Sequence, residues 1–409
     1  MVPTRAASLF LCVLLVSAGA AAFVTPQAQP TTTIHQASQP AIETPEVLAI
    51  GVERSNFTGT GLSVTGALAS QQYSVTQELT QRTIRERLQK ADNESDRHAV
   101  LVNATAALET EATQVIQESK ETRQAYLRGT LSTREYSTRI AKIHSRAEET
   151  IAVAQFIAEQ AEPGSQIKSR AVEVRAHLSM YTGPVRDKIA AAMKTGEGPE
   201  RVYVSAGQNG TALAVIDGET YIREATNPDG YSSAPGSIPE ASTLLENIRN
   251  QYPWVMNQSP GISFVPIPID TDTPRYAYVL TLNYPQGNIH AHIDTDTDAV
   301  YQEVQRIHLT SLNTSADRIV QDRELTVSIS RSFAGGPLYV NVTDRDESPV
   351  AAEILINNES VGSTGPDGTM WVIAPTGNFS VTAVAHSSDA RVETNMTLTN
   401  TKNPAALSS

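Results

Sequence analysis

Apolar side chains recur every three or four residues over residues 67–194, which is the spacing of amphipathic helices. Residues 92–95 interrupt the pattern, and Ser95 is the expected N-cap of the helix that follows. Ser132 and Glu135 have the spacing of a capping box, in which each side chain satisfies a backbone N–H group. Long helices with one narrow apolar stripe and short connections predict antiparallel helical hairpins, stacked as a coiled-coil-like bundle or rod.

The pattern changes to a period of two after residue 199, which is typical of half-buried strands. Asp217-Gly218 separates two alternating runs as a tight hairpin turn. An amphipathic helix is expected over residues 240–252, and further strands at 262–269, 276–283, 288–293 and 300–307. This region predicts a small α+β domain.

A third pattern begins near residue 324, where short alternating runs recur every 8 to 12 residues between Gly- and Pro-containing turns. It predicts a small all-β, Ig-like sandwich. The fold class is therefore α+β and multi-domain, with long antiparallel helical hairpins first and the sandwich last. The expected divisions are 1–24 signal peptide or anchor, 25–46 disordered linker, 47–198 short strand (47–52) plus helical bundle, 199–308 α+β module, 309–323 linker, 324–400 sandwich and 401–409 tail.

The N-terminus has the composition of a secretory signal peptide. Arg5 precedes an apolar run over residues 6–16, and small residues follow at 17–22. We expect cleavage near residues 20–22; an uncleaved membrane anchor is the alternative, because residues 6–24 are nearly long enough to span a bilayer. Cys12, the only cysteine, lies inside this segment. The expected location is secreted or cell-surface, on the extracellular face of the envelope.

The chain is acidic, with 31 Lys and Arg against 44 Asp and Glu and a net charge of −13. Only seven of the cations are lysines. An acidic, lysine-poor surface suits a protein dissolved in concentrated salt, where charge repulsion is screened; an ordinary acidic exported protein is the alternative. No basic stripe is present to neutralise phosphates, which argues against nucleic acid as a partner.

Ten Asn-X-Ser/Thr sequons predict a glycosylated surface. Their asparagines are Asn56, Asn93, Asn103, Asn209, Asn257, Asn313, Asn341, Asn358, Asn378 and Asn395.

Parts of the chain resemble known families. The helix at 240–252, the run from Tyr276 and the stretch 287–294 resemble a PepSY-type module, whose closing turn has the form D-x-x-T-G-x-V. Asp294, Thr297 and Val300 match that turn, while Asp298 stands in place of the glycine. The resemblance implies a helix on a small antiparallel sheet, and a role in binding or inhibition.

The last region resembles the carboxypeptidase-regulatory or transthyretin-like β-sandwich, through Pro349-Val350, Ile354, Gly362, Thr364, Asp367-Gly368, Pro375 and Gly377-Asn-Phe379. The order of the parts resembles secreted haloarchaeal proteins of unknown function. The segments "RVYV", "DGETYIREA", "YPWV" and "GGPLYVNV…VGSTGPDGTMW" carry that likeness.

The stretch "HAHIDTDTDAVY" is the strongest candidate for chemistry. Its polar side chains are weak candidates for a metal site: His290, His292, Asp294, Asp296 and Asp298. The aspartates have the 1, 3, 5 spacing of a calcium loop, but Ala299 and Gln305 stand where that loop needs Gly and Glu. A hairpin turn explains these residues better, so we expect no metal and no cofactor.

A catalytic constellation is not found in the sequence. Ser165 and Lys168, followed by Lys194-Thr-Gly196, imitate two penicillin-binding signatures, but the third is missing and Ser165 is better explained as a helix cap. Trp254 and Trp371 are expected to be core aromatics, with a carbohydrate platform as the alternative.

The expected function is that of an exported, non-enzymatic cell-surface or extracellular protein, structural or partner-binding. The alternatives are a PepSY-like regulator or inhibitor of an exported protease and, less favoured, an unrecognised hydrolase. The expected partners are an envelope or extracellular protein or glycan, a membrane only through the uncleaved N-terminal segment, and a second copy through the helical region.

Overall fold

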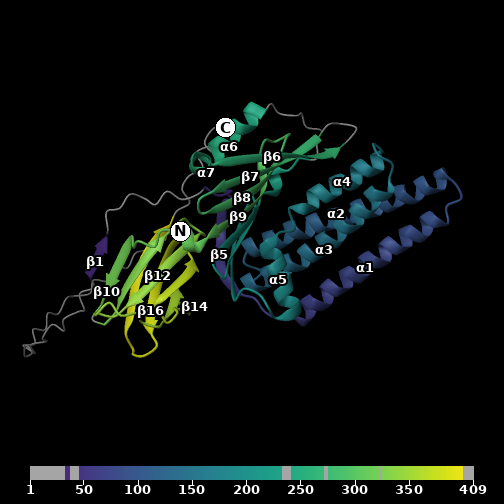
Figure 1. Ribbon diagram of the computed structural model, residues 1–409. Coiled ribbons are helices and arrows are strands. Elements are labelled where there is room, and N and C mark those ends of the chain that lie inside the picture. The colour runs from purple at the N-terminus through teal and green to yellow at the C-terminus, as the bar shows by residue number, and fades with distance from the viewer. Residues whose placement is uncertain (1–32, 37–45, 233–240, 271–274, 323, 399–409) are drawn as a thin grey trace, which may run out of the picture.

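A central antiparallel sheet organises the molecule. The computed structural model describes residues 33–36, 46–232, 241–270, 275–322 and 324–398. Eight strands lie in the order β2-β3-β4-β5-β9-β8-β7-β6. Long helices lie on one face of this sheet, and the sandwich and two short helices lie on the other (Figure 1).

Five helices form the helical layer: α1 Val64–Gln89, α2 Glu94–Leu127, α3 Thr133–Gln160, α4 Gln166–Ser179 and α5 Pro184–Thr195. The capping box is confirmed, because Glu135 N donates to Ser132 Oγ and Ser132 N donates to Glu135 Oε2. The prediction of Ser95 as a cap is wrong. Asn93 caps α2 by accepting from Asp96 N at 3.0 Å, so Ser95 already lies in the first turn.

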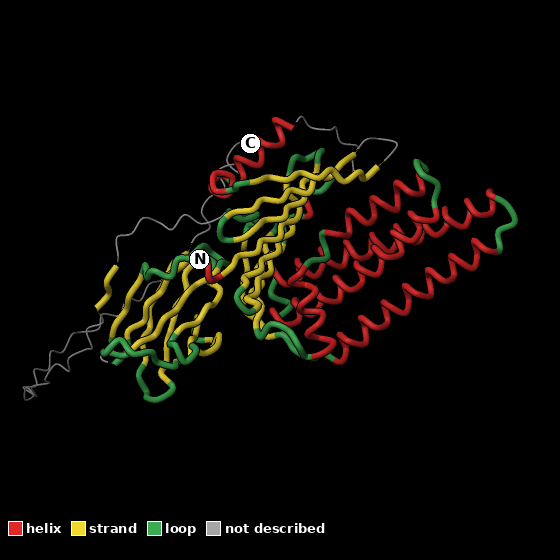
Figure 2. Tube along the Cα trace, in the orientation of Figure 1, coloured by secondary structure: helices red, strands yellow, loops and turns green. Residues whose placement is uncertain are grey.

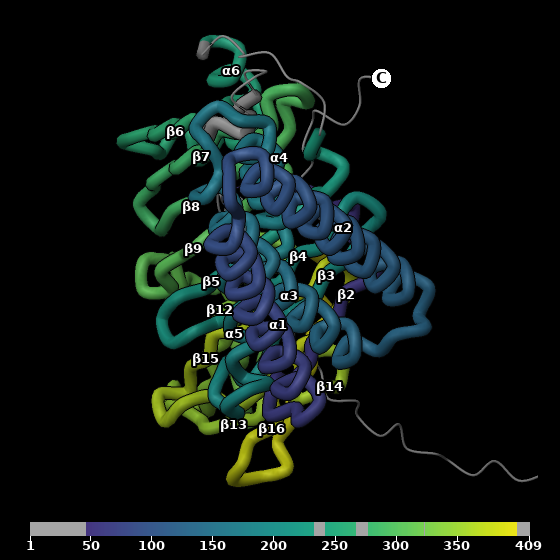
Figure 3. Tube along the Cα trace, turned by 90° about the vertical axis from the view of Figure 1, so that its right-hand side faces the viewer, coloured from purple at the N-terminus to yellow at the C-terminus, as the bar shows by residue number. Residues whose placement is uncertain are grey.

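The helices do not form a rod apart from the sheet. α3 and α5 pack directly on strands β3, β4 and β5, and one apolar cluster joins Tyr136, Val185 and Ile189 to Val204 and Leu213. Nearly every residue of those strands is buried, so both faces of the sheet need cover. Viewed from the helical side, the long helices stand in front of the sheet (Figure 3). Of the two predicted arrangements, bundle or rod, the helices form a bundle, and this bundle is packed on the sheet.

The strands of the sheet are β2 Val52–Gly59, β3 Arg201–Gly207, β4 Thr211–Asp217, β5 Thr220–Thr226, β6 Gly261–Asp270, β7 Arg275–Tyr284, β8 Gly287–Asp294 and β9 Val300–His308. Because β2 pairs with β3, the sheet takes strands from both sides of residue 198, where the sequence pattern suggested a boundary. The sheet is thus larger than a PepSY-type module implies. The face opposite the long helices carries the short helices α6 Ala241–Gln251 and α7 Pro253–Gln258. A short 3-10 helix, η1 Pro228–Gly230, follows β5.

The strand predicted at residues 47–52 is displaced. Residues 47–51 are irregular, and the strand begins at Val52. Leu48 N donates to the buried Glu303 side chain, and Leu48 O accepts from the buried Arg223 side chain. Gly51 has a φ of +60°, so neither residue has the backbone pairing or conformation of a strand.

The C-terminal region is a sandwich of two antiparallel sheets (Figure 2). One sheet has the order β1-β10-β11-β12-β15 and the other the order β14-β13-β16-β17. The bounds are β1 Thr33–Gln36, β10 Arg318–Gln321, β11 Thr326–Arg331, β12 Pro337–Thr343, β13 Ala352–Ile356, β14 Glu359–Ser363, β15 Thr369–Ile373, β16 Gly377–Ala385 and β17 Arg391–Leu398.

Both predicted linkers contribute to this sandwich. β1 comes from the 25–46 segment and pairs with β10, which itself lies in the 309–323 segment after η2 Leu309–Ser311. Both strands are only four residues long, and β1 is an edge strand whose pairing partner is distant in sequence, so the local pattern does not reveal them. The remaining residues of the 25–46 segment before Glu46, with the signal segment and the tail, lie outside the described residues.

The sandwich is fixed to the central sheet by an aromatic contact. Tyr221 is buried in the sheet and donates its hydroxyl to Gly335 O at 2.6 Å, while its ring meets Phe333 edge-on at 6.1 Å. Thr376 N donates to the Tyr203 hydroxyl at 3.0 Å. The aromatic rings bury apolar area at this contact, and the hydrogen bonds of the two hydroxyls fix its geometry. The described parts therefore form one body with a sheet in the middle.

Candidate functional site

The histidine- and aspartate-rich stretch is a structural turn. Asp294 is fully buried and accepts backbone N–H groups from Asp296 at 2.9 Å, Thr297 at 3.2 Å and Ser232 at 3.2 Å. Asp298 has a φ of +53°, a left-handed conformation that Asp adopts more readily than most residues other than glycine. The carboxylate is thus committed to closing the hairpin and to holding the loop before it.

The two histidines lie on β8, on the face that points to the helices. His290 Nδ1 is 3.1 Å from Thr281 Oγ1, and the His292 ring meets Tyr301 edge-on. Burial lowers the pKa of His290. Burial, together with the neighbouring His290, also lowers the pKa of His292 to about 4. Among the residues that the structure describes, no three His, Cys, Asp or Glu side chains are grouped to hold a metal ion.

The residues that imitate penicillin-binding signatures have structural positions. Ser165 Oγ accepts from Lys168 N and caps α4, and Gly196 ends α5 with a φ of +79°. Ser165 and Gly196 are therefore explained by their positions at helix ends, where a hydroxyl N-cap and a left-handed glycine are preferred. Neither tryptophan is fully buried: Trp254 packs on Tyr284 and Trp371 on Tyr339.

All ten sequon asparagines lie within the described residues, and nine are exposed. Asn341, on β12, is partly buried. The hydroxyl residue of the sequon is buried at three sites, where Asn56, Asn103 and Asn209 are followed by Thr58, Thr105 and Thr211. It is exposed at three others, where Asn93, Asn313 and Asn395 are followed by Ser95, Ser315 and Thr397.

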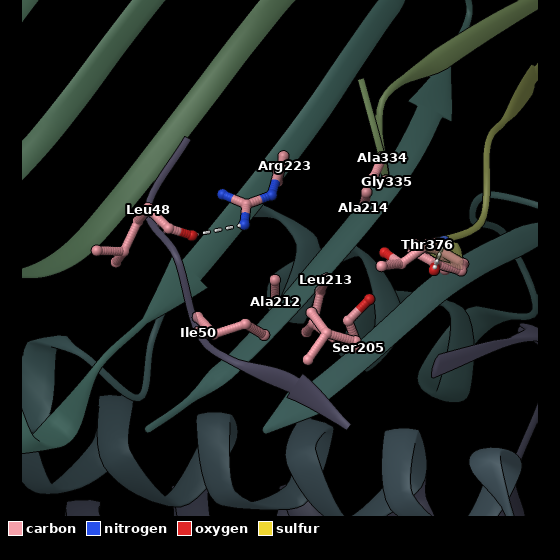
Figure 4. Close-up of a pocket in the computed structure, with 12 residues that line it drawn as sticks. Leu48, Ile50, Ser205, Ala212, Leu213, Ala214, Arg223, Ala334, Gly335 and Thr376 are labelled. Carbon is pink, nitrogen blue, oxygen red and sulfur yellow. Dashed lines mark hydrogen bonds between the residues drawn. The ribbon is translucent and has the colours of Figure 1, made fainter. Parts of the chain in front are cut away.

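A buried ion pair holds the chain just before β2 against the sheet. Glu303 on β9 is fully buried and accepts from Arg223 Nη1 at 2.8 Å, the Tyr252 hydroxyl at 2.7 Å and Leu48 N at 2.8 Å. Arg223 Nη2 returns a hydrogen bond to Leu48 O at 3.0 Å, as Figure 4 shows. Burial raises the pKa of Glu303, and the guanidinium opposes that rise. We call residues 46–51 the strap.

The strap is tied at a second point and leaves little space below it. Glu46 Oε1 accepts from Trp254 N at 2.8 Å, at the start of α7. Between the strap, β3–β4 and the Ala334–Gly335 turn lies a cavity of about 20 Å³ (Figure 4). Such a volume holds about one water molecule. This region is an attachment point, and it is too small to be a substrate site.

A second buried pair ties the helical layer to the same strand. Glu224 on β5 accepts from Arg186 Nη1 at 2.7 Å and from Val185 N at 2.7 Å, at the start of α5. Gly183 is needed there, because a Cβ at that position would lie 2.3 Å from the Glu224 carboxylate. Adjacent residues of β5 thus fix opposite faces of the sheet. The sequence signal for these two buried ion pairs is the adjacent Arg223 and Glu224 in the otherwise largely uncharged strand "TYIREAT". The ion pairs were not predicted.

A hollow larger than the cavity beneath the strap lies in the helical layer. A groove of about 510 Å³ runs between α1 and α2, with α3 as its floor. Its apolar lining includes Leu79, Ile84, Val100, Ala107 and Val153. Ligand sites of this size are common between helices of bundles. Sequence reasoning missed the groove, because it depends on how far apart α1 and α2 lie.

One end of the groove is polar. Arg146 on α3 donates to Glu111 Oε1 at 2.6 Å, Glu118 Oε2 at 2.9 Å and Gln114 Oε1 at 2.7 Å. Asn103, one of the sequon asparagines, lines the groove on α2. The groove therefore combines apolar side chains on its α1 and α2 walls with a fixed charge network, which suits a partner segment that has one apolar face.

Three family models match successive parts of the chain. Residues 3–198 match "Domain of unknown function (DUF7096)", residues 202–313 match "Family of unknown function (DUF7094)" and residues 316–392 match "Archaeal fibronectin-III type-like domain". The chain is therefore a multi-domain protein of archaeal type. Its last domain is a fibronectin-III-like sandwich, and the match is to that family rather than to the carboxypeptidase-regulatory or transthyretin-like one. The PepSY-type likeness finds no support among these matches.

A partial similarity to a curated enzyme also exists. The chain is 23% identical over 139 residues to 4-hydroxy-tetrahydrodipicolinate synthase of Syntrophotalea carbinolica, which covers 34% of this chain and 45% of that protein. No solved structure matches the chain. Within the described residues, no helix has the length and apolar character that crossing a membrane requires.

Proposed function

We propose that the protein acts outside the cell as a non-enzymatic binding protein, with the α1–α2 groove as its contact site. The apolar side chains on the α1 and α2 walls of the groove and its polar end support this proposal. So does the fibronectin-III-like domain, a fold type common in extracellular proteins. The acidic surface and the sequons fit an exported chain of a salt-dwelling organism.

The strap gives this proposal a mechanical basis. The N-terminal segment leads first into β1, which pairs with β10 of the sandwich, and only then into residues 46–51, which are bound to both α7 and the central sheet. A pull on the N-terminus therefore reaches the sandwich first and the central sheet next, rather than the helical layer. The groove lies at the other side of the sheet, where a partner can reach it.

The proposal is tested by a matched pair of groove variants. Ala107 on α2 lines the groove, while its neighbour Ala106 is exposed and does not. We expect A107W to fill the groove and A106W to leave it open. Envelope extract in high salt is passed over each immobilised full chain, and captured proteins and glycans are compared by mass spectrometry.

A partner retained by the unchanged chain and by A106W, but lost with A107W, supports the proposal. Equal capture by all three chains contradicts the role of the groove. Protease digestion of intact cells checks the location separately: digestion of the chain from outside is expected, and complete protection would contradict export.

A further inference from the structure

Helix α1 carries several large apolar side chains on its solvent-exposed face. Four of its large apolar residues are exposed: Val64 at 74%, Leu68 at 65%, Val75 at 51% and Leu79 at 58%. At about 100° per residue they fall within an arc of about 60°, so they form one stripe along the helix. Isolated exposed apolar residues are ordinary, but a continuous stripe marks a contact surface.

The inward face of α1 shows the opposite character. In its first half that face carries Gly66, Ser70 and Tyr73, and Ser70 Oγ lies 3.1 Å from Ser145 Oγ on α3. Further along, Gln81 Nε2 donates to Ala152 O at 3.1 Å. The first half of α1 thus docks on α3 through small and polar groups and leaves its larger aliphatic side chains outside, whereas Ile84 and Leu88 in the second half are buried in the core. α1 lies at the outer edge of the helical layer (Figure 1).

The stripe also lacks charge. Residues 55–77 contain no Asp, Glu, Lys or Arg, in a chain with 75 such residues in all. Glu78 is the only charged residue between Val64 and Leu79. Depletion of charge is the compositional mark of the centre of a protein interface. It also removes the repulsion that two acidic copies would otherwise feel.

The intervals between the stripe residues are the same counted from either end of the helix. Intervals of four, seven and four residues separate Val64, Leu68, Val75 and Leu79. When two copies of the helix pair antiparallel about the midpoint between Gln71 and Gln72, Leu68 meets Val75 of the other copy. Val64 likewise meets Leu79. A two-fold axis requires this reciprocity, in which residue i contacts j and j contacts i.

We propose that two copies of this chain associate through α1, antiparallel and two-fold symmetric, with Gln71 and Gln72 at the axis. The inference rests on α1 alone and is independent of the function proposed above. The groove between α1 and α2 stays outside the contact apart from Leu79 at its rim.

Cysteine cross-linking of the full chain tests the register. In a Cys12→Ser background, one differently tagged copy carries Leu68→Cys and the other Val75→Cys. Under mild oxidation the mixture is expected to form mainly the mixed disulfide dimer, while each variant alone forms much less. Ala106→Cys on α2, also exposed, is the control and is expected to remain uncross-linked.

Dimers of Leu68→Cys with itself, in preference to the mixed dimer, would mean a parallel pairing and would overturn the proposal. So would the absence of any dimer above the level of Ala106→Cys. Sedimentation equilibrium gives a second readout. Val75→Glu is expected to raise the dimer dissociation constant at least about tenfold, because the stripe would then bury a charge.

Ser74→Glu is the matched control, since it adds the same charge at the adjacent exposed position, off the stripe. It is expected to leave the dissociation constant nearly unchanged. Circular dichroism shows whether either variant keeps its helices. Equal weakening by both variants, with helices intact, would point to net charge and contradict a contact through the stripe.

Discussion

At the scale of single residues, burial decides which polar groups can act. His144 on α3 is 1% exposed, and burial together with the cations Arg186 and Lys194 lowers its pKa to about 3. The Glu148 carboxylate lies 3.3 Å from His144 Nε2 and Asp187 lies 3.9 Å away. Both carboxylates are more than half exposed, so water screens their attraction and desolvation dominates. His144 is therefore neutral in the folded protein.

A neutral buried histidine makes the fold sensitive to acid. The unfolded state binds a proton at this residue below a pKa of about 6.5, whereas the folded state does so only near 3. Its stabilising contribution is thus complete above pH 6.5 and is lost as the pH falls toward 3. Between pH 7 and 5 we expect a loss of about 2 kcal/mol in the free energy of unfolding from this group.

The variant His144→Gln should lose that part of the pH dependence, measured by chemical unfolding at each pH. His98→Gln on α2, where the side chain is exposed, should behave like the unchanged chain. An unchanged pH dependence in His144→Gln would show that folding does not lower the pKa of His144.

The sequons make a second prediction at this scale. If the sugar is attached after folding, the transferring enzyme must reach both the asparagine and the hydroxyl of the motif. We expect Asn93, Asn313 and Asn395 to be modified. Asn56, Asn103 and Asn209 should remain bare, because their threonines are buried. Peptide mapping of protein from native cells gives the occupancy of each site.

Full occupancy at Asn103 would contradict modification of the folded chain. It would also place a glycan at the groove, since Asn103 lines it. A bare Asn103 keeps the groove open for a partner, in agreement with the proposed function.

At the scale of elements, the sequence predicted what depends on local pattern. Four helices follow from spacing, and Gly183-Pro184 was expected to kink or restart the fourth; in the structure a new helix, α5, begins at Pro184. The turn at Asp294 was also predicted. The strands β1, β10, β14 and β17 were not. β1, β10 and β14 have only four or five residues, which is too few for a clear alternating signal, whereas β17 does alternate and was missed. The α1–α2 groove depends on packing between helices, which no local pattern reports.

Strand β5 is the element on which both layers depend. Arg223 and Glu224 face opposite sides and pair with Glu303 and Arg186 at 2.8 and 2.7 Å. Arg223→Met leaves the Glu303 carboxylate buried without its cation, so we expect a loss of about 3–5 kcal/mol in the free energy of unfolding. Adding Glu303→Gln should restore at least about half of that loss, because the amide carries no charge.

Arg82→Met is the control for this cycle. Arg82 and Glu86 form an exposed pair at 3.3 Å on α1, and removing it should change stability by less than about 1 kcal/mol. A small effect of Arg223→Met, similar to that of Arg82→Met, would show that the buried pair is solvated and does not hold the strap.

At the scale of the whole molecule, the central sheet joins parts that the sequence pattern separates. The helices cover one face, and the strap, α6, α7 and the fibronectin-III-like sandwich cover the other. The contact of Tyr221 on the sheet with Phe333 and Gly335 of the sandwich is buried and hydrogen-bonded. The helical layer and the sandwich should therefore keep one relative position.

The most direct test is a distance measurement across the sheet. Spin labels are placed on exposed residues, Ala106→Cys on α2 and Asn358→Cys between β13 and β14, in the Cys12→Ser full chain. Pulsed electron resonance, with singly labelled chains to identify distances between copies, is expected to give one narrow distance within a copy. A broad distribution, as from two domains on a flexible linker, would contradict the single-body structure on which the account depends.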